Sequence, residues 1–156
     1  MMVCREPRLQ VQEPPIQRLN RLRLQALADR YVEDANILLE NKRWSSAYYI
    51  VGYAVECGLK ACIARQVQQH DFPDLHTVKR SYTHDLKELL KLAGLQGDLE
   101  NRAEQSDGLR DNWGKVVTKW NESSRYEEPT QAMAEEMVHA VSDDEEGVLK
   151  WLKRNW

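Results

Sequence analysis

The sequence predicts an all-α fold, an up-and-down bundle of about four to five helices in a single domain. Apolar residues recur at three- and four-residue spacing along most of the chain, and no pair of segments shows the alternation typical of strands. The 156 residues include only seven Gly and five Pro, which favours long helices over an architecture with many tight turns. Residues 1–17 have no helical period, so we expect a flexible N-terminal extension ahead of a helical domain over residues 18–156.

The first two helices are expected on either side of a short connection. The first begins near Arg18 and ends near Asn41, because its apolar side chains form a stripe interleaved with charged ones. The second begins at Trp44, with Ser45 or Ser46 as its N-cap. This second helix is apolar on nearly every side, which is typical of the buried centre of a bundle.

Three further helices complete the expected bundle. A loop is expected over residues 71–83, followed by a short helix over residues 85–93 that Gly94 ends. A fourth helix is expected over residues 97–122. After a polar break, a fifth runs from about residue 130 to residue 154.

The central helix carries a polar stripe among its apolar side chains. Glu56 and Lys60 stand four residues apart with the glutamate first, which is the favoured order for an ion pair on a helix. Tyr49 and Tyr53 precede them on the same stripe. Buried charges are unfavourable unless they pair and find hydrogen bonds, so the stripe is either a structural network or one wall of a functional cleft.

Composition and charge narrow the class of protein. A net charge of −3 and a pI near 5.8 do not indicate a general nucleic-acid binder, although they are compatible with a local basic patch. Cys57 and Cys62 lie too far apart on one helix for a disulfide, and reduced cysteines favour a cytoplasmic location. We expect no signal peptide and no membrane span, because Glu56 and Lys60 interrupt the apolar stretch.

The sequence indicates neither a metal nor a cofactor. The histidines His70, His76, His84 and His139 form no His-x-x-x-His pair, and none lies at zinc-finger spacing from a cysteine. The glycine-rich loops that cradle nucleotide phosphates are absent. A phosphate would therefore need side chains or a helix N-terminus for its binding.

His84 is the first candidate outside the central helix. It lies between Thr83 and Asp85, two possible caps of the third helix. The helix dipole there favours a neutral imidazole, which is the state that acts as a base. The alternative is that His84 supports the cap or packs under the preceding loop.

The break before the fifth helix holds the other candidates. Arg125 has the aromatic neighbours Trp120 and Tyr126, and this combination can hold a phosphate and stack a base. The alternative is that Arg125 pairs with a nearby acid while the aromatic residues fill space between helices. From Glu127 to Glu146 the chain has eight acidic residues and no Lys or Arg, which favours a solvated face or a surface for a basic partner.

These segments, in this order, resemble the HEPN family of higher-eukaryote and prokaryote nucleotide-binding domains. The resemblance rests on Tyr48-Tyr49-Ile-Val-Gly-Tyr-Ala-Val-Glu56-Cys-Gly-Leu-Lys60-Ala, on Thr83-His84-Asp85-Leu86, and on Trp120 through Arg125-Tyr126. It implies a compact helical bundle that commonly forms a homodimer with a cleft between the protomers. It also implies either a metal-independent ribonuclease, such as the toxin of a toxin–antitoxin pair, or a non-catalytic partner of a small nucleotidyltransferase.

The ribonucleases of this family carry an arginine and, after four to six intervening residues, a histidine in a late helix, where the pair steadies the phosphate and moves protons. The later half of this chain has no such pair. Arg65 and His70 have the spacing, but they lie at the end of the central helix.

Two hypotheses follow from the sequence. The first, which the missing motif favours, is a non-catalytic HEPN-like module that binds a nucleotide, RNA, or a protein such as an antitoxin or a nucleotidyltransferase. The second is an endoribonuclease whose catalytic residues are His84 and Arg125, or else Arg65 and His70. In both hypotheses, the stripe on the central helix is chiefly a buried network that borders a cleft. The candidate ligand-binding residues are Trp120, Tyr126, Tyr49, Tyr53, Glu56 and Lys60.

Overall fold

The computed structural model describes residues 18–67 and 72–156, so the expected N-terminal extension and His70 lie outside the described residues. Within those two ranges every regular element is a helix and there is no strand. The all-α prediction is therefore confirmed. No helix in this part of the chain combines the length and the apolar character that crossing a membrane requires.

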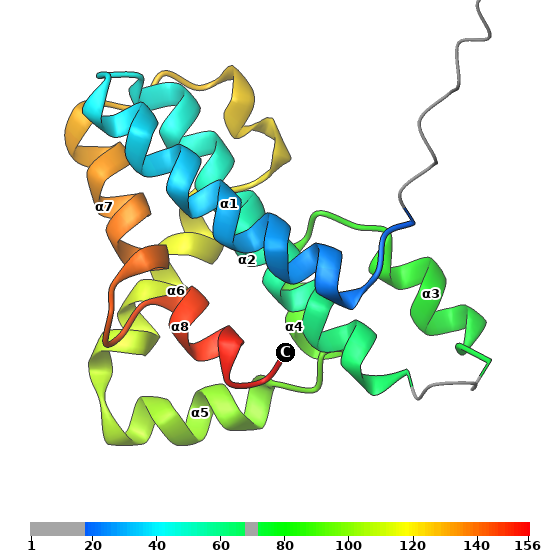
Figure 1. Cartoon of the computed structure of the whole chain (residues 1–156). Helices are drawn as coiled ribbons and strands as arrows, with labels where there is room; N and C mark the ends of the chain where they lie inside the picture. Colours follow the sequence, from blue (N-terminus) through cyan, green and yellow to red (C-terminus); the bar gives the residue numbers. More distant parts are fainter. Residues whose placement is uncertain (1–17, 68–71) are drawn as a thin grey trace, which may run out of the picture.

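The helices form a bundle around α2 (Figure 1). Their order along the chain is α1 (Arg21–Glu40), α2 (Trp44–Gln66), α3 (Leu75–Ser81), α4 (Leu86–Leu92), α5 (Gln96–Gln105), α6 (Asp107–Lys119), the 3₁₀ helix η1 (Glu122–Tyr126), α7 (Gln131–Ser142) and α8 (Val148–Lys153). Helix α1 lies alongside α2 for most of its length, and α4, α7, α8 and η1 also contact α2. Helix α3 stands apart from the bundle at one end of the molecule (Figure 1).

The expected caps of α2 are wrong. Neither Ser45 nor Ser46 caps the helix, which begins at Trp44 after Arg43 and has no side-chain cap. The turn from α1 is closed by backbone hydrogen bonds instead, because the N–H groups of Lys42 and Arg43 donate to carbonyls near the end of α1. These backbone hydrogen bonds fix the start of α2, so the helix needs no polar side chain as an N-cap.

The two long helices expected in the later half are each divided. Ser106 has an extended backbone and caps α6 by accepting from the N–H of Gly108, so the break separates α5 from α6. The expected fifth helix ends at Ser142, and a turn from Asp143 to Gly147 leads into α8. The Asp143 side chain holds this turn by accepting from the N–H group of Glu146. Hydrogen bonds of the Ser106 and Asp143 side chains thus interrupt the two expected helices, although the spacing of apolar residues around them is helical.

Helix α3 replaces most of the loop expected over residues 71–83. Asp74 caps it by accepting from the N–H of Thr77, and none of its seven residues is buried. The next helix agrees with its prediction, since Asp85 caps α4 and Gly94 follows it with a φ of +68°.

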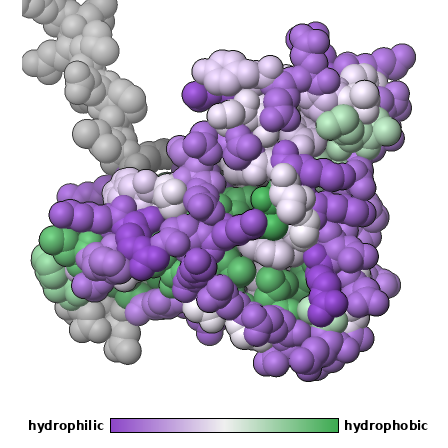
Figure 2. All heavy atoms as spheres, turned by 180° about the vertical axis from the view of Figure 1, so that it is seen from behind, coloured by the Kyte–Doolittle hydropathy of each residue, from purple (hydrophilic) through white to green (hydrophobic). Residues whose placement is uncertain are grey.

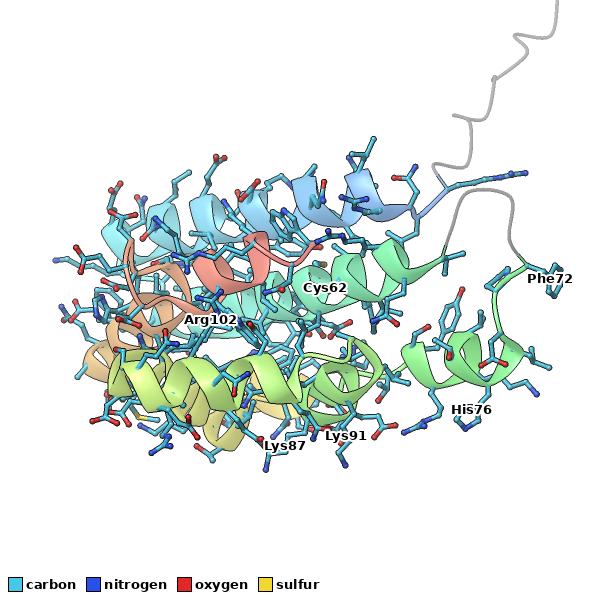
Figure 3. The ribbon with its side chains drawn as sticks, turned by 90° about the horizontal axis from the view of Figure 1, so that it is seen from below. Cys62, Phe72, His76, Lys87, Lys91 and Arg102 are labelled. Atoms are coloured by element: carbon cyan, nitrogen blue, oxygen red, sulfur yellow. The ribbon has the colours of Figure 1, made fainter. Side chains whose placement is uncertain are left out.

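The core lies along α2, where Glu56 is the one buried charged residue of the described chain. Cys57 and Cys62 are buried on the same helix, and Figure 3 shows Cys62 within the bundle. Burial raises the pKa of Cys57 to about 11 and the pKa of Cys62 to about 12. Both thiols are therefore protonated at neutral pH, which makes them poor nucleophiles.

We expect these thiols to make stability fall in alkaline solution. Their pKa values are higher in the folded chain than the usual value of about 8.5. Their contribution to the free energy of unfolding is therefore complete below about pH 8.5 and is lost as the pH rises towards about 11. The urea midpoint should therefore decrease above about pH 9, and less steeply in Cys62→Ala than in the wild type. Equal slopes for the two proteins would contradict the burial argument.

Candidate functional site

The polar stripe of α2 centres on Glu56, whose two carboxylate oxygens both have partners. Lys60 Nζ donates to Oε1 at 2.7 Å, so the expected ion pair is present. His84 Nδ1 lies 2.8 Å from Oε2. Only 6% of the Glu56 side chain is exposed, against 20% for Lys60 and 49% for His84. The buried carboxylate thus joins α2 to the segment before α4, a contact that the sequence analysis did not anticipate.

His84 is held by Glu56 and does not serve as the helix cap. Asp85 accepts from the N–H groups of α4, and Thr83 Oγ1 accepts from the N–H of Asp85, so the capping positions are already filled. The carboxylate bond at Nδ1 orients the imidazole ring and leaves Nε2 for another partner. About half of the His84 side chain is exposed, and Nε2 has no hydrogen-bond partner among the described residues.

Two tyrosines extend the stripe towards the start of α2. The hydroxyl groups of Tyr49 and Tyr53 lie 2.9 Å apart. The Tyr53 ring makes edge contacts with the rings of His84 and Trp120, with centroid distances of 6.0 and 5.1 Å. Burial, followed by the hydrogen bond with Tyr49, raises the pKa of Tyr53 well above its usual value. Its hydroxyl therefore stays protonated and remains a hydrogen-bond donor.

Trp120 is buried beneath this stripe, where it supports the site and is not free to stack on a base. Its Nε1 donates to the carbonyl of Tyr49 at 3.0 Å, and its ring is only 4% exposed. The ring lies directly on Gly52, where any side chain would overlap the indole. In the sequence, this close approach of the indole is indicated by Gly52, because glycine has no side chain to obstruct it.

Arg125 and Tyr126 form the exposed edge of the site on η1. The Arg125 guanidinium lies 4.9 Å from the centre of the Tyr126 ring, and Tyr126 is 76% exposed. Interactions with the side chains of Tyr126 and then Tyr49 raise the pKa of Arg125. Arg125 forms no ion pair with another residue of the described ranges, so the acidic partner considered from the sequence is not observed. The site therefore combines one cation with exposed aromatic surface.

The model of the HEPN domain matches residues 23–156, which is most of the chain. The chain belongs to the HEPN domain family. Comparisons with curated proteins and with solved structures find no match.

In this HEPN domain, the three segments that carried the resemblance meet on one side of α2. Tyr49, Tyr53 and Glu56 come from α2, His84 from the connection to α4, and Arg125 from η1. Arg65 lies elsewhere, because its guanidinium donates to the carbonyl of Asn155 near the C-terminus. Its expected partner His70 lies outside the described residues. Across residues 18–67 and 72–156, no group of three or more His, Cys, Asp or Glu side chains is placed to hold a metal ion.

Proposed function

We propose that this HEPN domain binds single-stranded RNA, without cleaving it, on the face formed by Tyr49, His84, Arg125 and Tyr126. The observation that supports this proposal is the convergence of these side chains from three distant segments onto one side of α2. We define these four residues as the RNA face.

The chemistry of the RNA face suits a nucleic-acid backbone and an unstacked base. The Arg125 guanidinium can hold a phosphate, and the exposed Tyr126 ring can stack a base. Single-stranded RNA offers both groups together, and such bases are the usual targets of aromatic side chains. The acidic stretch that follows, from Glu127 to Glu146, would confine a negatively charged ligand to one side of η1.

The arrangement of the RNA face favours binding over cleavage. Arg125 interacts with Tyr126 and Tyr49, whereas His84 interacts with Glu56 and Tyr53, and no contact between Arg125 and His84 is found. Cleavage needs a base and a cation at the same phosphate. The chain also lacks the Arg–His pair of the family's ribonucleases in its later half.

One observation favours endoribonuclease activity as a second candidate function. The buried carboxylate of Glu56 orients the half-exposed His84 and leaves its Nε2 without a partner among the described residues, as a general base requires. Under this alternative, His84 would act on a ribose 2′-hydroxyl while Arg125 holds the neighbouring phosphate.

We expect Arg125→Ala and Tyr126→Ala each to weaken RNA binding about tenfold or more, since one stacked base contributes about 1–3 kcal/mol. The measurement is the fluorescence anisotropy of a labelled single-stranded RNA in EDTA. Arg110→Ala is the matched control, because Arg110 is an exposed arginine on α6 outside the RNA face.

Two outcomes would change the proposal. Absence of RNA binding at high protein concentration would reject it. Cleavage of the RNA in EDTA, lost in His84→Ala and kept in Arg110→Ala, would establish the endoribonuclease in its place.

The partners implied by the family resemblance are part of the same proposal. A homodimer would place two RNA faces in one particle, and light scattering measures its mass directly. An antitoxin or nucleotidyltransferase partner would compete with RNA if it covered Arg125, and would leave RNA binding unchanged if it bound elsewhere.

A further inference from the structure

A second surface, far from η1, surrounds helix α3. Most of the exposed large hydrophobic side chains of the described chain lie at this end of the molecule, and Figure 2 shows hydrophobic residues gathered there, at the left of that view. Phe72 is 96% exposed and points away from the bundle (Figure 3). Single exposed apolar residues are common on proteins, but a gathering of them indicates an interaction surface. The exposed residues at this end are Leu19, Leu22, Val67, Phe72, Leu75 and Tyr82.

Four of these side chains, those of Leu19, Val67, Phe72 and Tyr82, border a hollow of about 430 Å³ between α3, the start of α1 and the end of α2. We call it the α3 groove. Its walls include Leu24, Ile63, Ala64 and Val78, and its volume lies within the range of ordinary ligand pockets. The groove therefore has aliphatic walls that can accept apolar side chains, beside polar residues such as Asn20, Thr77 and Ser81.

Helix α3 is poorly supported by the rest of the chain. It has seven residues, none of them buried, and an isolated helix of this length is unstable in water. Among the described residues, its one ion pair to a neighbouring element joins Arg80 to Glu88 on α4. No helix of the described ranges packs over the side that faces the α3 groove, which includes Val78. A bound partner would complete the packing of this helix.

Cationic residues flank the lining residues of the α3 groove in the sequence, although the whole chain is acidic. Arg18, Arg23 and Lys79 are sequence neighbours of lining residues, and none of them forms an ion pair within the described chain. The one acidic side chain in its lining is Asp74, whose carboxylate already caps α3. A partner with negative charge around an apolar stripe would complement this surface.

We propose that the α3 groove binds an acidic amphipathic helix of a partner protein. The apolar stripe of that helix lies in the groove, and its carboxylates lie against Arg18, Arg23 and Lys79, as in other helix-in-groove complexes. A second copy of this chain would instead bring like charges together across a two-fold interface. RNA would satisfy the cations but would leave the aliphatic walls without an apolar partner.

The test uses a fluorescein-labelled synthetic helix of about 18 residues, with leucines at i, i+3, i+4 and i+7 and glutamates elsewhere. We expect saturable binding to the full chain that weakens as salt is added, because part of the attraction is electrostatic. Val78→Glu should weaken binding at least tenfold, because Val78 lines the groove. This variant leaves the core intact, because α3 has no buried residue. Ile37→Glu is the matched control, at an exposed apolar position outside the groove.

Several results would overturn this proposal. They are absence of binding, equal binding of a scrambled peptide without an apolar face, and equal binding by Val78→Glu. A wild-type dimer that Val78→Glu converts to a monomer would assign the groove to a second copy instead. The Arg125→Ala variant should bind the helix normally, so failure here leaves the RNA proposal unaffected. Loss of RNA binding in Val78→Glu would show that the groove serves RNA.

Discussion

Replacing Glu56 with alanine is expected to lower the free energy of unfolding by about 3 kcal/mol, the low end of the range of about 3–5 kcal/mol for breaking a buried ion pair. The side chain is almost wholly buried, and its removal leaves Lys60 and His84 without their partner. Lys60 keeps 20% of its side chain exposed, which lets water compensate part of the loss. Urea unfolding at neutral pH, followed by circular dichroism, measures the change.

Two further variants separate the buried pair from ordinary surface charge. Glu56→Gln keeps the shape and a hydrogen-bonding oxygen, so it should lose less stability than Glu56→Ala. Glu136→Ala removes the partner of Lys119 at the surface and should change stability by less than about 1 kcal/mol. If Glu56→Ala unfolds at the same urea concentration as the wild type, the stripe does not stabilise the fold and its role is confined to ligand binding.

The second large effect is expected at Gly52. In Gly52→Ala, the new methyl group would overlap the indole of Trp120, so the ring must move and break its hydrogen bond to the carbonyl of Tyr49. Overpacking of this kind typically costs about 1–3 kcal/mol, and the lost hydrogen bond adds about 1 kcal/mol. Because Trp120 leads directly into η1, displacement of its ring should also weaken RNA binding through Arg125.

Gly114→Ala provides the matched control for this substitution. Gly114 lies inside α6, and a methyl group there would meet nothing within 4 Å. The substitution should therefore stabilise the protein by about 0.5–1 kcal/mol, since alanine is the better helix former. In the double variant Gly52→Ala, Trp120→Leu, the smaller leucine side chain relieves the overlap. The double variant should therefore lose less free energy of unfolding than the sum of the losses in the two single variants. Strict additivity would show that the two residues are not in contact.

Local patterns predicted the parts of the fold that depend on near neighbours in the sequence. The spacing of apolar residues gave the first two helices, and Gly94 marked the end of α4 because its left-handed conformation suits glycine. The order and four-residue spacing of Glu56 and Lys60 predicted their ion pair. The helix breaks were not predictable in this way. Ser106 ends one helix through hydrogen bonds that include the distant Glu146, and nothing near it in the sequence marks that partner.

The sequence by itself determined the helical class, the family and the polar stripe, because helical period and motif spacing are properties of adjacent residues. Only the tertiary structure decided what the stripe touches. The bond between Glu56 and His84 spans 28 residues, and Trp120 reaches Gly52 from an element that the pattern of α2 cannot specify. Packing of distant segments against one buried helix brought the candidate residues together, and it left α3 exposed at the other end.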